Sequence, residues 1–175
     1  GSLALTAGGL RTTLSAFTAG VASIRPLSSL PIVTSPLVVD ARTQPGWTTA
    51  PLVELDGSSA GNATGVALNA PNIRWAGFLV SRWGAHGVLV YAAATSTTLQ
   101  GNWIGLNAAG TAAATNTLSN ITVLGSALIG GSTSTDRNVI SGSAMHGVLL
   151  ESNGNQVKGN YIGTNATGTA AVPNV

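Results

Sequence analysis

Short apolar runs separated by polar turns recur along most of the chain. Four of them have closely similar sequences and lie at intervals of 22 to 33 residues: GVAL (65–68), GVLV (87–90), NITV (120–123) and GVLL (147–150). Brief runs of this kind, rich in β-branched residues and bounded by glycine, serine or asparagine, are typical of short strands joined by turns. The pattern predicts an all-β protein.

Longer segments of the sequence also repeat. GNWIGLNAAGTAAATN (101–116) returns as GNYIGTNATGTAAVPN (159–174), with eleven of sixteen positions identical, and LVSRWGAHGVLV (79–90) matches VISGSAMHGVLL (139–150). A period of about 60 residues indicates a solenoid, and it fits two β-coils whose loops differ in length. We therefore expect residues 21–175 to form the coils of a single domain.

Alignment of single coils places equivalent residues in columns. Because alternate side chains of a strand face opposite sides, two columns are expected to face inward and one outward. The first inward column is Val80, Ile104, Ile140 and Ile162. The second is Phe78, Asn102, Asn138 and Asn160, and the outward column is Leu79, Trp103, Val139 and Tyr161.

Three asparagines on successive coils predict a structural ladder. Asn102, Asn138 and Asn160 can bond to one another at the strand spacing of about 4.8 Å, which satisfies amides that would be costly to bury alone. The alternative is three unrelated turn asparagines.

The outward column is the candidate ligand-binding face. Trp103 and Tyr161, with Val139 and Leu79 in the same column, offer rings that could stack on sugars or join a protein interface. A lateral loop such as 106–116 could instead cover Trp103, and these alternatives stay open.

The N-terminal region has a different periodicity. In GLRTTLSAFTAG (9–20), Leu10, Leu14 and Phe17 share one helical face, and Gly20 can end the helix. We expect residues 3–20 to form a short capping helix, since the first coil of a solenoid needs cover. Residues 1–2 are interpreted as a cloning scar, and the sequence stops at Val175 where a repeat would restart, which suggests truncation at the C-terminus.

These motifs carry a family resemblance. GLRTTLSAF resembles the SLREAI-type cap of large bacterial parallel β-helix proteins, and SPLVVDARTQPGW (35–47) with PLVELDG (51–57) resembles their first coils. GNYIGTNATGTAAVPN and RNVISG (137–142) are typical of their repeat. The resemblance covers nearly the whole chain and implies a right-handed parallel β-helix of the pectin-lyase-like superfamily.

The resemblance is specific for fold rather than function. Members are mostly predicted secreted or cell-surface proteins, so an extracellular or cell-surface location is expected. The chain carries Thr12-Thr13 where the family's cap tends to be charged. It also has IGLN (104–107) and IGTN (162–165) in place of the usual IGTD, which weakens a calcium-loop hypothesis.

Composition narrows the classes of partner. Only 7% of residues are charged, against about 25% in average domains, and the net charge is +2, so a nucleic-acid surface is not expected. No apolar stretch is long enough to suggest membrane insertion. The absence of cysteine excludes disulfides and thiolate metal sites.

Polysaccharide lyases and hydrolases share this fold, so the acidic residues and histidines are candidate catalytic residues. Glu54 and Asp56 lie on one face of a strand, about 7 Å apart, which suits acid–base chemistry but also fits turn-flanking residues. His86 and His146 occupy equivalent turns with Ser119 on the coil between, roughly 10 Å apart, too far for one metal ion. We assign no catalytic residue, no metal ligand and no cofactor.

The sequence therefore favours a non-catalytic structural or adhesive β-helix module of a secreted or cell-surface bacterial protein, with polysaccharide as the candidate partner of the outward face. One alternative is an N-terminal fragment of a polysaccharide lyase or glycoside hydrolase. Another is a self-assembling solenoid that pairs end to end through its uncapped C-terminal coil.

Overall fold

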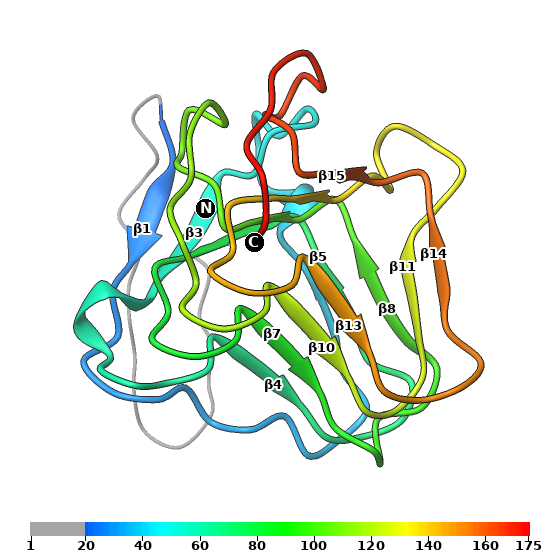
Figure 1. Ribbon diagram of the computed structural model, residues 1–175. Coiled ribbons are helices and arrows are strands. Elements are labelled where there is room, and N and C mark those ends of the chain that lie inside the picture. Colours follow the sequence, from blue (N-terminus) through cyan, green and yellow to red (C-terminus); the bar gives the residue numbers. More distant parts are fainter. Residues whose placement is uncertain (1–19) are drawn as a thin grey trace.

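Three parallel β-sheets make up the fold in the computed structural model, which describes residues 20–175 (Figure 1). The capping helix expected over residues 3–20 falls on positions outside the described part, apart from Gly20. Within residues 20–175, no helix is long and apolar enough to span a membrane.

Across residues 20–175, the sheets contain fifteen strands, each of two to four residues. Sheet A has the order β1 (Ala22–Ile24), β3 (Val53–Asp56), β6 (Phe78–Ser81), β9 (Trp103–Ile104), β12 (Val139–Ile140) and β15 (Tyr161–Ile162). Sheet B contains β4 (Val66–Leu68), β7 (Val88–Val90), β10 (Ile121–Val123) and β13 (Val148–Leu150). Sheet C contains β2 (Val38–Asp40), β5 (Arg74–Ala76), β8 (Thr97–Gln100), β11 (Ala127–Gly130) and β14 (Gln156–Lys158).

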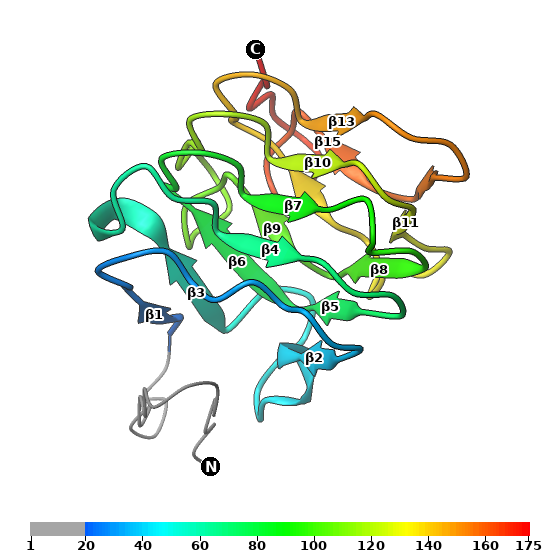
Figure 2. The same ribbon diagram turned by 90° about the horizontal axis from the view of Figure 1, so that it is seen from below.

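From β2 onward the chain visits the sheets in a fixed order, C, then A, then B, and each visit adds one strand beside the previous one (Figure 2). Every strand pairing is parallel, as this path requires. The arrangement is consistent with a parallel β-solenoid. It confirms the prediction of an all-β fold.

The strand register confirms the predicted columns. Val80 pairs with Ile104, Ile104 with Ile140, and Ile140 with Ile162. The outward column is in register in the same way. Each of the four similar apolar runs, GVAL, GVLV, NITV and GVLL, forms a strand of sheet B that begins one residue later than the run itself.

Sheet C was not predicted from the sequence as a sheet distinct from sheet A. The segment WAGFLVS (75–81) bends at Gly77 between β5 and β6, and Gly101 and Gly159 occupy the equivalent corners of later coils. All three glycines have positive φ, between +64° and +80°. At Gly77 a Cβ would also lie 2.5 Å from the Arg42 side chain, so the corner leaves no room for another residue.

In the described part of the chain, two short 3-10 helices follow β2 of sheet C and β3 of sheet A. They are η1 (Ala41–Thr43) and η2 (Gly57–Ser59). Each begins after an aspartate, Asp40 or Asp56, whose carboxylate accepts a hydrogen bond from the N–H two residues later. The two carboxylates thus have a local structural role at the ends of their strands.

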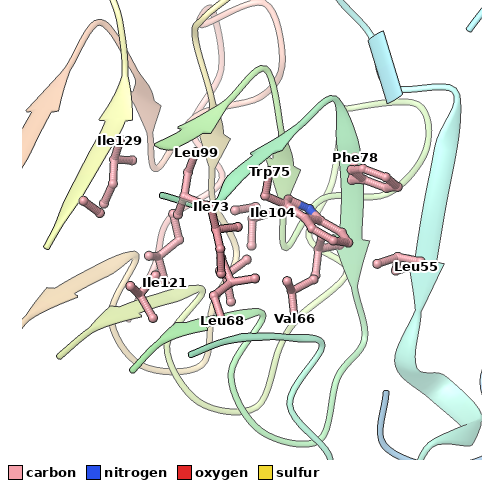
Figure 3. Packing of buried hydrophobic residues seen from close by; sticks show 14 of the residues in the cluster. Leu55, Val66, Leu68, Ile73, Trp75, Phe78, Leu99, Ile104, Ile121 and Ile129 are labelled. Carbon is pink, nitrogen blue, oxygen red and sulfur yellow. The ribbon is translucent and has the colours of Figure 1, made fainter. Parts of the chain in front are cut away.

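The core lies between the sheets and is filled by their inward side chains. Leu99 and Ile129 come from sheet C, Ile104 from sheet A and Ile121 from sheet B, and all four are fully buried (Figure 3). Near the first coils the core is aromatic, and the rings of Trp75 and Phe78 stack with their centroids 4.5 Å apart.

Two identical residues of one column provide a test of this core. Ile140→Ala should lower the free energy of unfolding by about 3 kcal/mol, as is usual for a buried isoleucine. Ile162→Ala should cost less than half of that, because Ile162 is 46% exposed whereas Ile140 is 0% exposed. Urea unfolding followed by circular dichroism measures both, and equal losses would contradict the described end of the core.

Candidate functional site

The outward column of sheet A, predicted as a ligand-binding face, is covered. Leu79 and Val139 are fully buried, and Trp103 and Tyr161 are only partly exposed. The four side chains belong to a second hydrophobic cluster, on the outer side of sheet A, with Leu106, Val172, Val21 and Ala166. The hypothesis of an open aromatic face is therefore wrong for this column, and the covering alternative holds.

The cover consists of two loops, 105–116 and 163–174, which we call the cover loops. Gly110 lies against Trp103, where an added Cβ would be 2.7 Å from the indole Cζ3 atom. Gly168 lies against Tyr161, where a Cβ would be 2.8 Å from the ring Cζ atom. The loops also contact each other, because the Ala166 N–H donates to the Gly110 carbonyl at 2.8 Å.

Each cover loop is held in shape by its own asparagine. The Asn107 Oδ1 atom accepts from the Thr111 N–H at 2.9 Å, and Asn165 Oδ1 accepts from the Thr169 N–H at 2.9 Å. Arg137 adds a contact on the second ring, with its guanidinium carbon 4.2 Å from the Tyr161 centroid. The conserved spacing within the repeat thus encodes a loop that folds back on the aromatic residue preceding it.

The asparagines of the inward column form a continuous row of hydrogen bonds. Asn102 donates to Asn138 Oδ1 from its backbone N–H at 2.9 Å and from its Nδ2 atom at 3.1 Å. Asn138 donates to Asn160 Oδ1 in the same two ways, both at 3.0 Å. The row begins at Phe78, whose N–H donates to Asn102 Oδ1 at 3.0 Å.

A second amide cluster was missed by the sequence analysis. Asn116 Nδ2 donates to Asn120 Oδ1 at 2.8 Å, and Asn120 Nδ2 lies 3.3 Å from Asn174 Oδ1. Asn116 and Asn174 also accept backbone N–H bonds, from Trp83 at 3.0 Å and from Ser143 at 3.1 Å. The available signal was that the two copies of the repeated segment both end in asparagine.

The candidate acid pair is brought together but is occupied by arginine. Arg82 donates from Nη2 to Glu54 Oε1 at 2.7 Å and from Nε to Asp56 Oδ1 at 2.9 Å. Arg25 Nε reaches Asp56 Oδ2 at 2.8 Å, and the Ser81 hydroxyl donates to Glu54 at 2.8 Å. Both carboxylates are buried on the outer side of sheet A.

Electrostatics fix the charge state of Asp56. Burial would raise the pKa of its carboxyl group, but hydrogen bonds from Arg82 and from Ser58 outweigh burial and hold the pKa well below its usual range. Asp56 is therefore ionised under ordinary conditions. The same holds in direction for Asp40, whose pKa is lowered chiefly by its hydrogen bonds from Arg42 despite partial burial.

Arg42 forms a separate group of charges with Asp40 and Asp136. It forms two bonds to Asp40, with Nε to Oδ1 at 2.9 Å and Nη2 to Oδ2 at 2.8 Å, and its Nη1 atom lies 3.7 Å from Asp136. Its side chain runs against the corner glycines Gly77 and Gly101. This arginine thus links η1, directly after β2, to the loop between β11 and β12 that carries Asp136.

The two histidines lie in equivalent turns that flank Ser119, as expected. His86 Nδ1 is 3.0 Å from the Thr122 hydroxyl, and His146 Nδ1 is 3.3 Å from the Ser119 hydroxyl. Burial lowers the pKa of His86, which favours the neutral imidazole. Among residues 20–175, no three side chains of the His, Cys, Asp and Glu types gather as a metal site would require.

The contact between loop and ring leads to a prediction about Gly110. Gly110→Ala should lower the free energy of unfolding by about 2–4 kcal/mol, because a methyl group there overlaps both Ala166 of the other cover loop and Trp103, and the backbone conformation is strained for alanine. Gly61→Ala is the matched control, since its φ of +68° equals that of Gly110 within 1° and nothing lies within 4 Å. Thermal unfolding of both variants, alone and with Trp103→Ala, measures the contact; equal costs for the two glycines would rule it out.

The buried acid pair leads to a prediction about how much each arginine contributes to stability. Arg82→Ala should cost about 2–3 kcal/mol, less than for a fully buried pair because Arg82 is 37% exposed. Arg25→Ala, which removes a 63% exposed partner of the same carboxylate, should cost less than about 1 kcal/mol.

The sign of the pH effect follows from the lowered pKa of Asp56. Its contribution to stability is complete above the unfolded value of about 4 and is lost as the pH falls towards the lower folded value. The stability difference between wild type and Arg82→Ala should therefore shrink as the pH is lowered from about 5 to about 2 in urea titrations. A difference that grows with acid would contradict the assigned ion pairs.

No protein-family model, curated protein or solved structure matches this chain. Its function is accordingly inferred from the covered column, the paired carboxylates and the asparagine rows.

Proposed function

We propose that the chain is a non-catalytic structural module, a right-handed parallel β-helix of the pectin-lyase-like type, in a secreted or cell-surface bacterial protein. Three parallel sheets visited in constant order support the architecture, as does the row of asparagines at one corner. The motifs shared with bacterial β-helix proteins support the family and the location. Such a module holds the parts of a larger surface protein at fixed separations.

The state of Glu54 and Asp56 is the observation that carries the non-catalytic role. Glycoside hydrolysis requires one carboxyl group that gives up a proton and a second that acts as base or nucleophile. Here one guanidinium contacts both groups, and the lowered pKa of Asp56 makes it a poor proton donor. Asp40 and Asp136 are likewise close to Arg42. Four of the five acidic side chains thus lie in ion pairs within the fold.

If the module is also adhesive, polysaccharide is its proposed partner, on the basis of the sequence resemblance. The covered column removes the residues first considered for it, because backbone of the cover loops lies on both rings. A flat sugar ring cannot stack where Gly110 and Gly168 already sit. Any glycan contact would use other parts of the surface.

A depolymerisation assay tests the proposal. The protein is incubated with a panel of plant and bacterial polysaccharides, and reducing ends and unsaturated uronates are measured. We expect no product from the wild type or from Glu54→Gln. Product that forms with the wild type and is lost in Glu54→Gln would overturn the structural role in favour of a lyase or hydrolase fragment.

Affinity electrophoresis through the same polymers tests the adhesive side, with Trp103→Phe as the control that keeps an aromatic ring beneath its loop. Retardation of both proteins, with the polymer intact, is the expected result. A loss of retardation in Trp103→Phe alone would restore the outward column as a binding site. No retardation on any polymer would remove polysaccharide from the proposal.

Self-association is a second candidate role, favoured by the apolar side chains exposed on the last coil. Leu150, Val157 and Ile162 are 42%, 40% and 46% exposed. Light scattering over a range of concentrations tests it, and a mass that stays monomeric at high concentration would exclude it.

A further inference from the structure

In the part of the chain that the structure describes, the last strands of the three sheets form one surface to which no further strand is paired, and we call it the open rung. It consists of β13, β14 and β15, each of which has a neighbour on one side only (Figure 1). Its inward residues Leu150, Val157 and Ile162 are 40–46% exposed. Their register partners one rung earlier, Val123, Ile129 and Ile140, are all 0% exposed. The open rung therefore exposes side chains of columns that are fully buried one rung earlier.

The asparagine row has a direction, and the open rung is its donor end. In each internal step, the backbone N–H and the Nδ2 group of one asparagine converge on the Oδ1 atom of the next, as Asn102 does on Asn138 and Asn138 on Asn160. Asn160 is the last member of this row. Its Oδ1 is occupied, whereas within residues 20–175 its backbone N–H has no acceptor.

Each asparagine also makes a bond back to sheet C. The Nδ2 groups of Asn102, Asn138 and Asn160 donate to the carbonyls of Trp75, Leu99 and Ile129, at 3.1, 2.8 and 2.9 Å. These three carbonyl residues occupy one column of sheet C, and the next member of that column is Val157. At the open rung, the Val157 carbonyl thus corresponds to the acceptor that the next asparagine would use.

We propose that the open rung is a docking surface for a further β-coil that carries asparagine at the ladder position, in an extended segment of the kind Gly-Asn-aromatic-Ile-Gly. A side-chain amide satisfies both requirements in the way the internal rungs do, since its oxygen accepts from Asn160 and its nitrogen donates to Val157. An aspartate would accept without donating, and an aliphatic residue would do neither. The docked coil must also place apolar side chains over Leu150, Val157 and Ile162.

The front edge of a second copy lacks this chemistry. In sheet A the ladder position passes from Phe78 back to Val53 and then to Ala22 in β1. A second copy stacked head to tail would therefore present alanine to Asn160 and leave its donors without an acceptor. Buried donors without partners cost about 1–3 kcal/mol each, which weighs against end-to-end pairing of identical chains.

A chain extended by one coil tests the proposal. Residues 117–142 are copied and joined after Asn174, the position that corresponds to Asn116 in the repeat. The copied segment then carries its own version of Asn138 at the ladder position. In the matched control this copied asparagine is replaced by leucine, which keeps the volume and removes the amide.

Amide hydrogen exchange at Asn160 is the readout, with the N–H groups of Asn102 and Asn138 as internal references. In the coil with asparagine, exchange at Asn160 should slow at least about ten-fold towards the reference rates, and Tm should rise by several degrees. The leucine coil should leave Asn160 unprotected and raise Tm by less than half as much. Equal protection by both coils, or protection by neither, would overturn the proposal.

The unextended chain supplies the remaining outcome. If it dimerises in light scattering and Asn160 becomes protected in the dimer, the open rung accepts a second copy and the proposed asparagine-bearing partner is wrong. The inference rests on the structural role proposed above, but each of the two can be overturned without the other. Depolymerisation of a polysaccharide would overturn that role without changing exchange at Asn160, and loss of the Asn160 effect would leave the depolymerisation result unchanged.

Discussion

The rest of the structure depends on how the backbone is satisfied at the corner between sheets C and A. There the chain turns within a few residues, and its N–H groups cannot reach the next strand in the usual ladder geometry. The side-chain amides of Asn102, Asn138 and Asn160 supply the missing acceptors, and they also donate hydrogen bonds to one another. Because each amide fixes the height of the next rung, it also fixes the register of the strands on both sides of the corner. The columns of the core follow from that register.

The same constraint explains why the repeated segment determines several features of the fold at once. Within GNWIGLNAAGTAAATN, the first asparagine joins the row at the corner, Ile104 fills the core and Gly110 lies on Trp103. The last asparagine, Asn116, joins the second amide cluster. The segment therefore specifies a corner, a rung and a cover for the outer side of sheet A in one continuous stretch. Its identical positions are explained by internal contacts.

Sequence reasoning succeeded where the structure depends on period and repetition. The columns, the asparagine row and the strands of sheet B could all be predicted, because stacked coils place equivalent positions above one another. The corner at Gly77 was overlooked, since glycine within an apolar run does not by itself reveal a bend. The burial of Leu79 and Val139 and the pairing of Arg82 with Glu54 depend on contacts between neighbouring coils, whose residues lie far apart in the sequence. Arg82 in addition has a φ of +58°, a backbone conformation that its residue type does not suggest.

Stacking also accounts for the unusual composition. In this architecture each strand residue has a register partner in the next rung, about 4.8 Å away, so a charge is always close to whatever occupies its column. The described strand pairings avoid placing charge on charge: Glu54 pairs with Leu79, Asp56 with Ser81, Arg74 with Thr98 and Lys158 with Gly130. Neutral amides, hydroxyls and apolar groups can stack in register without repulsion, whereas repeated acids or bases cannot. A chain with 7% charged residues, four of its five acids paired with arginine, is what such a stack selects.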